Sequence, residues 1–571
     1  MEETRAMKRY TEWVNRARAD KEMLKDLRNL ITKPGVIEEE FSAELDFGTA
    51  GLRALMGPGP SRMNIYTVAA AAKGCAQYLL RQEGEAGAVI SYDSRHGSKL
   101  FAEITAKMLA SSGVHVYLFR EMHPVPMLSF AVRRISAAGG VMITASHNPK
   151  EYNGFKVYRA DGAQLTDKEA AEVSMLTPMP EEIFEEVAAF DSLKDYLEEG
   201  TVEWVPEDID RAYTNYLIDS VRHHEIGSRA RADVRIVYSP LHGTGARPLL
   251  ETLHTLGYEK VFEVHDQMKP DGDFPTVRCP NPEYDDTYDE ALRFAHQVMA
   301  DIVLLTDPDA DRLGVAVYAD GEYHILNGNQ IGCILMEFLL STRAAKDAIP
   351  ENGFAAISVV SSHLARAICG HYGVKLYETL TGSKNTAALI REHQDEGEEY
   401  FLFGFEESHG YLFGGEVRDK DAIAAALIIA EMTTMMKPKG IRLYSQLEAI
   451  YNLYGYASEK SLSIEYTSDR LFGKRKSDRL MEHFRSLGGK LGEEGTSLGQ
   501  IEVSGWHDFM PEANVLLYRL RGLDWMAFRP SGTEPKFKVY LGFYGKKSVA
   551  ESRAERTLRL IEKELRDYFG A

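Results

Sequence analysis

The segment Leu304-Leu305-Thr306-Asp307-Pro308-Asp309-Ala310-Asp311-Arg312 joins a short apolar run directly to three aspartates spaced two residues apart. The apolar run is typical of a buried strand, so the aspartates are expected at a strand end. The same order, a strand-like run and then a polar loop that leads into an amphipathic helix, recurs along the chain. It is found at 88–92, 114–118, 141–144, 235–238, 355–360, 376–380 and 401–405. Alternating strands and helices predict α/β domains with doubly wound sheets, whose ligands bind beyond the carboxyl ends of the strands.

The recurring units divide the chain near residues 205 and 322. We expect a helical lead-in and three α/β domains, over 1–40, 41–205, 206–322 and 323–440. The segment 441–500 is rich in charge and ends in glycine pairs, and we interpret it as a linker with helical content. Over 501–571, three strand-like runs before a final helix predict a smaller α+β domain with antiparallel strands.

Composition narrows the class of protein. The chain has 571 residues and a net charge of −20, which argues against nucleic acid and against anionic membrane surfaces as partners. Its four cysteines are scattered without metal-ligand spacing, and the charged N-terminus lacks the apolar region of a signal peptide. The longest apolar run, 422–430, is too short to span a bilayer and is interpreted as a core helix. We therefore expect a cytoplasmic protein.

The three aspartates predict a metal site. Carboxylates crowded at a strand end repel one another unless a cation or bound protons offset their charge, and oxygen ligands favour Mg2+. A calcium EF-hand is excluded, because its sixth loop position would be Arg312 instead of glycine and its twelfth Tyr318 instead of glutamate. The remaining alternative is a surface turn with three unbound aspartates.

A serine follows another strand-like run. Residues Ala145-Ser146-His147-Asn148-Pro149-Lys150 come after Gly140 to Thr144, and a serine exposed there suggests a nucleophile or a phosphate carrier. An ordinary turn is an equally good interpretation from these residues alone. Lys156 comes after an Asn153-Gly154 turn that would fold the chain back as a hairpin and bring an amine near the serine. The amine could accept a proton if its pKa is lowered; otherwise it is an exposed surface lysine.

Three further loops carry chemistry. Arg529-Pro530-Ser531-Gly532-Thr533-Glu534-Pro535-Lys536 lies between two strand-like runs and could bind a dianion, or be a simple hairpin turn. The Gly404 to Gly410 loop could read sugar hydroxyls with its carboxylates and hydroxyl, or be the start of a helix. Arg53 follows a glycine-rich loop and could reach into a cleft.

Five motifs in this order resemble the α-D-phosphohexomutase family, in particular its larger bacterial phosphoglucomutase/phosphomannomutase type. They are FGTAGLR (47–53), TASHNP (144–149), DPDADR (307–312), FEESHG (405–410) and RPSGTEPK (529–536). The resemblance covers the chain from about residue 40. It implies three similar α/β domains with mixed sheets and a smaller C-terminal α+β domain, with one loop from each domain meeting at a central cleft.

The resemblance also implies roles for individual residues. Ser146 corresponds to the phosphoserine, and Asp307, Asp309 and Asp311 to Mg2+ ligands completed by a phosphate oxygen on Ser146. The other catalytic residues that the resemblance implies are Arg53, His147 and Lys156, with Lys156 as a candidate general base. The substrate-binding residues are Arg312, Lys384, Glu406, Ser408, Arg529, Ser531, Gly532 and Thr533.

The implied activity is that of an isomerase that interconverts glucose 1-phosphate and glucose 6-phosphate. It proceeds through a phosphoserine enzyme and a glucose 1,6-bisphosphate intermediate, with one Mg2+ per chain. Ser383 and His409 depart from what many relatives carry, so phosphomannomutase and phosphopentomutase activities stay open. A metal-dependent sugar phosphatase and a non-catalytic phosphosugar sensor are the more distant alternatives. The assembly is expected to be a monomer or a homodimer.

Overall fold

The computed structural model describes residues 4–45, 48, 51–82, 87–221, 227–465, 476–488, 503–510, 513–530 and 536–569. The chain forms two compact units. The first consists of Met1–Asn327, Ala387–Glu392 and Ser408–Leu443, and the second of Gly328–Thr386, His393–Glu407 and Tyr444–Ala571. The first unit holds the predicted first and second domains, and the second unit holds most of the third domain together with the C-terminal one.

The first domain is built on a six-stranded sheet in the order β1-β5-β4-β2-β3-β6. Its strands are β1 (Leu52–Leu55), β2 (Gly87–Tyr92), β3 (His115–Leu118), β4 (Gly139–Ile143), β5 (Tyr152–Arg159) and β6 (Val202–Trp204). Strands β4, β2, β3 and β6 are parallel, whereas β5 and β1 are antiparallel to their neighbours, so the predicted mixed sheet is confirmed. Strands β2 and β4 are buried along their whole length, which explains their continuous apolar sequence.

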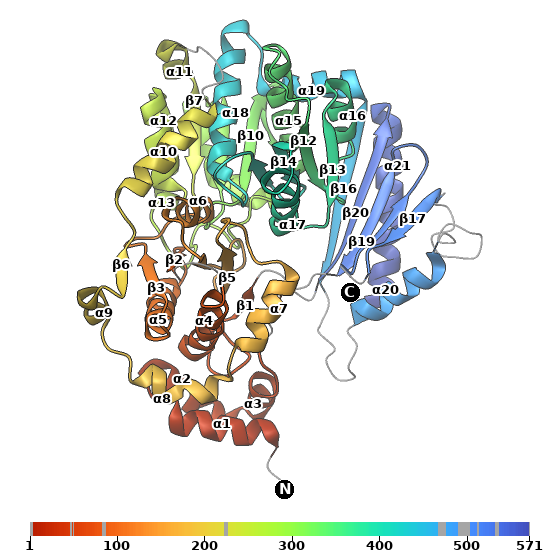
Figure 1. Ribbon diagram of the computed structural model, residues 1–571. Coiled ribbons are helices and arrows are strands. Elements are labelled where there is room, and N and C mark those ends of the chain that lie inside the picture. Colours follow the sequence, from red (N-terminus) through yellow and green to blue (C-terminus); the bar gives the residue numbers. More distant parts are fainter. Residues whose placement is uncertain are drawn as a thin grey trace. The chain divides into compact units, whose positions relative to one another are not determined.

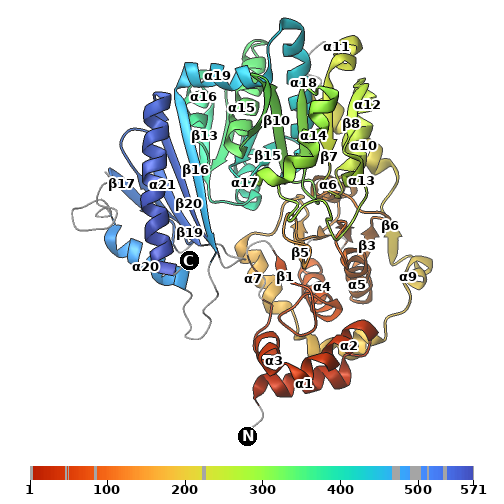
Figure 2. The same ribbon diagram turned by 180° about the vertical axis from the view of Figure 1, so that it is seen from behind.

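Four helices contact the strands of this sheet: α4 (Ile65–Leu79), α5 (Ser98–Ser111), α6 (Val125–Ile135) and α9 (Leu193–Glu199). A fifth helix, α7 (Asp167–Leu176), packs on α4. The predicted helical lead-in forms α1 (Arg5–Arg16), α2 (Lys21–Asn29) and α3 (Pro34–Phe41). Figures 1 and 2 both show these three helices at one end of the domain, and Figure 1 shows α8 (Phe184–Ala188) beside α1 and α2.

Trp13 of α1 fastens the lead-in to the first domain. Its side chain is fully buried, its ring makes edge contacts with the rings of Phe41, Tyr66 and Phe184, and its indole N–H donates to Glu181. An indole that both packs and donates a hydrogen bond is costly to remove.

We expect Trp13→Ala to destabilise the first domain by about 3–5 kcal/mol, because it removes a large buried side chain and leaves a cavity. The measurement is the thermal unfolding of the full chain. Trp506→Ala is the control, since the Trp506 side chain is 43% exposed. Equal shifts for the two variants would contradict the anchoring role of Trp13.

The second domain carries a five-stranded sheet in the order β11-β10-β9-β7-β8. Its strands are β7 (Arg235–Ser239), β8 (Lys260–Glu263), β9 (Ile302–Thr306), β10 (Leu313–Ala319) and β11 (Glu322–Leu326). Strands β8, β7 and β9 are parallel and the other two are antiparallel. The helices are α10 (Asp208–Val221), α11 (Ser228–Asp233), α12 (Ala246–Leu256), α13 (His265–Met268) and α14 (Asp289–Val298). The run predicted as a core helix forms α18 (Ala422–Met436), which packs on α10, α12 and β9 and is buried along most of its length.

In the second unit, the third domain has parallel strands β13, β12 and β14 side by side. The elements of this part of the chain are α15 (Gly328–Ala344), β12 (Gly353–Ser358), α16 (Leu364–Tyr372), β13 (Lys375–Thr379), α17 (Ser383–Ile390), β14 (Tyr400–Glu406), β15 (Gly410–Phe413) and α19 (Leu443–Tyr454). Residues 404–406 thus belong to β14 and residues 407–409 form the turn to β15, so the alternative of a helix start is wrong.

The C-terminal domain is an antiparallel sheet in the order β16-β20-β19-β18-β17. Its elements are β16 (Tyr456–Glu465), α20 (Lys476–Leu487), β17 (Gly505–Asp508), β18 (Leu516–Arg519), β19 (Trp525–Pro530), β20 (Lys536–Gly545) and α21 (Lys547–Phe569). The helical content expected in 441–500 is present as α19 and α20. The interpretation as a linker is wrong, because β16 pairs with β20 along its whole length and the apolar side chains of α20 lie in the core of this domain. The domain therefore starts near residue 456.

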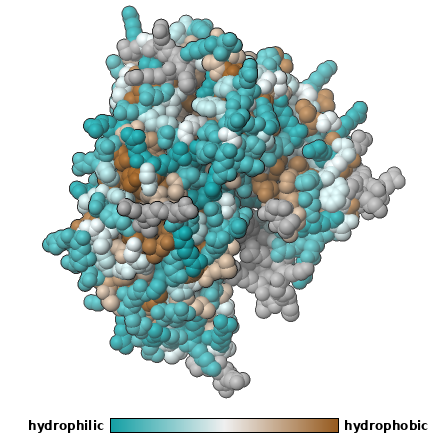
Figure 3. All heavy atoms as spheres, viewed as in Figure 1, coloured by the Kyte–Doolittle hydropathy of each residue, from teal (hydrophilic) through white to brown (hydrophobic). Residues whose placement is uncertain are grey.

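The surface and the cysteines complete the description. The face drawn in Figure 3 is mostly hydrophilic, and its apolar side chains occur in small separate groups. All four cysteines are free thiols. Among the described residues, none of the helices has the length and apolar character needed to cross a membrane.

Candidate active site

Ser146 lies in the loop that joins β4 to β5. The two strands are antiparallel, with Met142 opposite Lys156, so the chain does fold back as a hairpin. The Asn153-Gly154 pair lies within β5 and does not form the turn, so that part of the expectation is wrong. Gly154 is needed in the strand because a Cβ atom there would lie 2.5 Å from the carbonyl oxygen of Thr144. The turn is the serine loop itself.

The hydroxyl of Ser146 points at the aspartate cluster. Its Oγ donates to Asp307 Oδ2 at 2.9 Å and lies 3.2 Å from His147 Nδ1. The residue is only 2% exposed, whereas the sequence predicted an exposed serine. Its φ of +53° is in the left-handed region, which non-glycine residues adopt at a cost when surrounding contacts hold them there.

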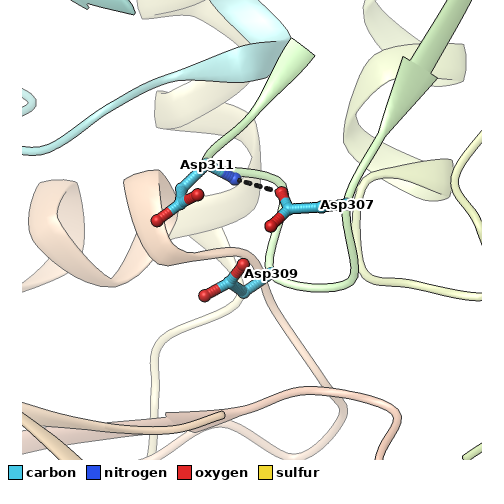
Figure 4. Close-up of side chains that lie close together, drawn as sticks. All are labelled: Asp307, Asp309 and Asp311. Carbon is cyan, nitrogen blue, oxygen red and sulfur yellow. Dashed lines mark hydrogen bonds between the residues drawn. The ribbon is translucent and has the colours of Figure 1, made fainter. Parts of the chain in front are cut away.

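The three aspartates converge in the loop between β9 and β10 (Figure 4). All three are buried, and one ligand atom from each lies within 4.8 Å of the others. The second oxygen of Asp307 accepts hydrogen bonds from the backbone N–H groups of Asp311 and Arg312, at 3.1 and 2.9 Å. One oxygen each of Asp309 and Asp311 has no hydrogen-bond partner although it is buried. Buried carboxylate oxygens without donors fit a hard divalent cation.

Two lysines lie against this cluster. Lys156 Nζ is 2.9 Å from Asp309 Oδ2 and 3.6 Å from Asp311 Oδ2, and Lys420 Nζ is 3.2 Å from Asp311 Oδ2. Burial by itself would lower the pKa of Lys156, but the attraction of Asp309 and Asp311 outweighs it and raises the pKa. This direction is opposite to what a proton acceptor requires in the metal-free protein. The role of Lys156 as a general base stays a prediction.

The carboxyl groups of the cluster also shift one another's pKa values. Burial, followed by repulsion from Asp309 and Asp311, raises the pKa of Asp307 well above its usual value. Burial acts in the same direction on Asp309, but the nearby Lys156 ammonium and a hydrogen bond from Asp307 lower its pKa overall. Without a cation, the environment thus favours protonation of Asp307 over protonation of Asp309.

Strained loops hold the aspartate loop in place. The neighbouring loop of the second domain approaches so closely that a Cβ atom at Gly243 would lie 2.4 Å from Pro308 Cα. On the other side, Leu313 N–H donates to His409 O at 3.0 Å. Five non-glycine residues of these loops and the serine loop have positive φ: Ser146, Leu241, His242, Ala310 and His409. Such strain gathers where a site must be held in one geometry.

Two arginines from the predicted set lie in the same unit. Arg53 of β1 donates to Asn148 Oδ1 at 3.1 Å, so it contacts the serine loop. Arg312 forms an ion pair with Glu283, and its Nε lies 3.9 Å from Asp311 Oδ1. Ser408 precedes His409 in the turn after β14, and it is partly buried.

The other predicted residues lie in the second unit or outside the described part. Glu406 ends β14 and accepts a hydrogen bond from the backbone N–H of Gly382, which joins its loop to the loop of Lys384. Arg529, the first residue of the predicted dianion loop, lies on β19. Ser531, Gly532 and Thr533 lie outside the described residues.

The site contains three groups that the sequence reasoning missed. Lys420 belongs to the charged run Arg418 to Asp421, and such a run before an apolar helix usually lies at the surface. Asp93 and Arg95 were noted only as part of a polar loop, but both are buried beneath the serine loop. A signal did exist for the pair, since opposite charges two residues apart follow a strand that is buried along its length.

Comparisons with known proteins agree with this geometry. Three protein-family models match consecutive parts of the chain. They are "Phosphoglucomutase/phosphomannomutase, alpha/beta/alpha domain I" over residues 44–181, domain II over 211–321 and domain III over 327–454. The chain belongs to the phosphoglucomutase/phosphomannomutase family. The resemblance stated from the five motifs is thereby confirmed.

Relatives of the family cover nearly the whole chain. A phosphoglucomutase of Staphylococcus epidermidis is 36% identical over 542 residues, which are 91% of this chain and 94% of the relative. A solved phosphoglucomutase/phosphomannomutase family protein of Burkholderia thailandensis has a TM-score of 0.66 at 16% identity, covering 91% of this chain and 97% of that one. A solved Aspergillus fumigatus N-acetylphosphoglucosamine mutase, in complex with GlcNAc-6P and magnesium, has a TM-score of 0.51 at 14% identity, covering 92% and 96%. At such identities the solved structures show a common fold.

Proposed function

We propose that the chain is a phosphoglucomutase that interconverts glucose 1-phosphate and glucose 6-phosphate with Ser146 as the phosphate carrier. The observation that carries the proposal is the Ser146 hydroxyl 2.9 Å from Asp307, at the edge of a buried three-aspartate cluster. The 36% identity to a phosphoglucomutase over 91% of the chain favours glucose as the sugar.

The three aspartates, with a phosphate on Ser146, would hold a divalent cation, and their oxygen ligands favour Mg2+. When bound there it would withdraw electron density from the phosphate and offset its charge. The carboxylates support this, because Oδ1 of Asp309 and Oδ1 of Asp311 are buried and accept no hydrogen bond.

The chain's own residues supply the rest of the reaction. A sugar hydroxyl attacks the phosphorus, the bond from phosphorus to Ser146 Oγ breaks, and the new bond to the sugar oxygen forms. Lys156, as a neutral amine, is the candidate that accepts the proton of the hydroxyl, and Ser146 Oγ takes up a proton as it leaves. The bisphosphate then turns over and returns its other phosphate to Ser146. Arg53 lies beside the loop, where it can stabilise charge on the transferred group.

We expect Lys156→Met to lower kcat by about a hundredfold or more at saturating Mg2+, the usual contribution of a positioned acid or base. Lys150→Met is the matched control, because Lys150 is exposed and pairs only at the surface, with Asp273 at 3.0 Å. Initial rates with glucose 1-phosphate measure the effect. A Lys156 variant as active as the Lys150 variant would remove Lys156 from the mechanism.

Phosphorus NMR tests the proposed activity directly. The full chain is incubated with glucose 1-phosphate, Mg2+ and a trace of glucose 1,6-bisphosphate, and growth of the glucose 6-phosphate signal is the expected result. Growth of inorganic phosphate at the rate of substrate loss would indicate a phosphatase instead. Parallel incubations replace glucose 1-phosphate with mannose phosphate or pentose phosphate. If one of these is isomerised while glucose 1-phosphate stays unchanged, the sugar assignment is wrong and the mutase assignment holds.

A further inference from the structure

The guanidinium of Arg95 lies under the serine loop and donates hydrogen bonds to the carbonyl oxygens of that loop. Nη2 donates to the carbonyl oxygens of Ser146, at 2.6 Å, and Asn148. Nη1 donates to those of Pro149, at 2.8 Å, and Tyr152, at 3.2 Å. The residue is only 3% exposed. Four main-chain carbonyl oxygens of this loop therefore accept hydrogen bonds from the buried guanidinium of Arg95.

Asp93 fixes this arginine and extends its hold to the backbone of the serine. Its Oδ2 lies 3.3 Å from Arg95 Nε and accepts a hydrogen bond from Thr144 Oγ1 at 2.6 Å. Thr144 Oγ1 accepts in turn from the backbone N–H of Ser146 at 2.7 Å. The other carboxylate oxygen of Asp93, Oδ1, accepts hydrogen bonds from Ser98 Oγ at 2.7 Å and from the backbone N–H of Arg95 at 3.0 Å. The carboxylate is thus the hub of a buried network that reaches Ser146 from both sides.

The second domain closes the other side of the arginine. The ring of Phe274 lies 4.9 Å from Arg95 Cζ, and its own φ of +45° is strained. Cys279 Sγ donates to the carbonyl oxygen of His147 at 2.9 Å. Because these contacts come from the domain that carries the aspartates, they tie the position of the serine loop to the position of the aspartate loop.

We propose that Arg95, held by Asp93, is a positioning residue that keeps the 144–152 loop in the one conformation in which Ser146 Oγ faces the aspartate cluster. Four converging carbonyls repel one another without a cation, and the left-handed conformation of Ser146 relaxes unless contacts hold it. A lysine would not replace the arginine, because its compact head lacks the planar fork that reaches four acceptors. The proposal rests on the proposed function of Ser146 as phosphate carrier.

Chemical rescue of Arg95→Gly in the full-length enzyme tests the proposal. We expect kcat to fall about a hundredfold, the cost of misplacing a reacting group by about 1 Å, while KM for glucose 1-phosphate stays nearly unchanged. Guanidinium chloride, at concentrations far below those that unfold the protein, refills the space and restores at least a tenth of the wild-type kcat. Sodium chloride at the same ionic strength does not. Arg95→Lys stays impaired.

Arg231→Gly is the matched control, since Arg231 is a buried arginine that pairs with Glu431 at 3.2 Å, on α11 and α18, away from the serine loop. It is expected to lose thermal stability but to keep its kcat, with no response to guanidinium. A loss of kcat in Arg95→Gly that guanidinium does not restore, or that Arg231→Gly shares, would overturn the positioning role.

Amide hydrogen exchange over 144–152 separates this inference from the proposed function. We expect faster exchange in Arg95→Gly than in the wild type, and slower exchange again once guanidinium is added. Protection that is the same in both proteins would contradict the inference whatever the enzyme's substrate is. Wild-type protein that fails to form glucose 6-phosphate would overturn the proposed function and leave the exchange result to decide the role of Arg95.

Discussion

Ser146→Ala is expected to lower the rate of glucose 1-phosphate isomerisation by about 10⁴-fold or more while the chain stays folded. The variant removes the one oxygen that accepts and returns phosphate, and loss of a nucleophile is the largest single effect a substitution has on such chemistry. The fold is retained because an alanine keeps the backbone N–H bond to Thr144 and the carbonyl bond to Arg95.

A matched control exists in the same domain. Ser136 follows α6 in the same left-handed conformation, with φ of +59° against +53° for Ser146, so Ser136→Ala makes the same chemical change at a similar backbone geometry. We expect it to keep full activity. Coupled assays of both variants, with thermal unfolding to verify the fold, measure the difference. An active Ser146 variant would exclude this serine as the carrier.

Asp307→Asn is expected to reduce kcat on the order of a thousandfold and to abolish stabilisation by Mg2+. One fewer carboxylate weakens the cation site, which supplies the charge stabilisation of the transfer. The metal-free fold should be unaffected, because an asparagine oxygen can still accept hydrogen bonds from the Asp311 and Arg312 N–H groups.

Thermal unfolding with and without Mg2+ separates binding from catalysis. A ligand that binds only the folded state raises its stability with concentration, so the wild-type midpoint should rise with Mg2+ and the midpoint of the variant should not. Asp301→Asn is the control, because Asp301 pairs with Lys437 and caps the backbone of Arg235, away from the cluster. A variant midpoint that rises with Mg2+ as the wild type does would place the cation elsewhere.

Much of the α/β architecture could be predicted from continuous apolar runs and the polar loops that follow them. The apolar runs before Ser146 and Asp307 are β4 and β9, which are buried throughout, so their sequences are continuous and the loops after them are easily placed. Strand β16 was missed because it lies at the edge of its sheet and pairs only with β20. Its sequence, Tyr456 to Glu465, is largely polar, as edge strands often are, and was therefore interpreted as a linker.

The environment of the site was harder to predict than its reacting groups. The Asp93–Arg95 pair leaves a signal in the sequence, but the main-chain carbonyls that Arg95 binds carry no side-chain signature that a sequence could reveal. Lys420 reaches Asp311 only because α18 is buried against the second domain, which places the charged run before it at the cluster. The same carboxylates that predicted a cation also bind Lys156, so its raised pKa follows from contacts that spacing alone does not show.

Transfer of phosphate through Ser146 tests the central claim most directly. The full chain is labelled with radioactive glucose 1,6-bisphosphate, the labelled peptide is identified by mass spectrometry, and the label is then chased with unlabelled glucose 1-phosphate. The account predicts one phosphate on the peptide that contains Ser146, and its loss to sugar phosphate at least as fast as kcat. Label on another residue, no stable label, or a chase slower than turnover would contradict it.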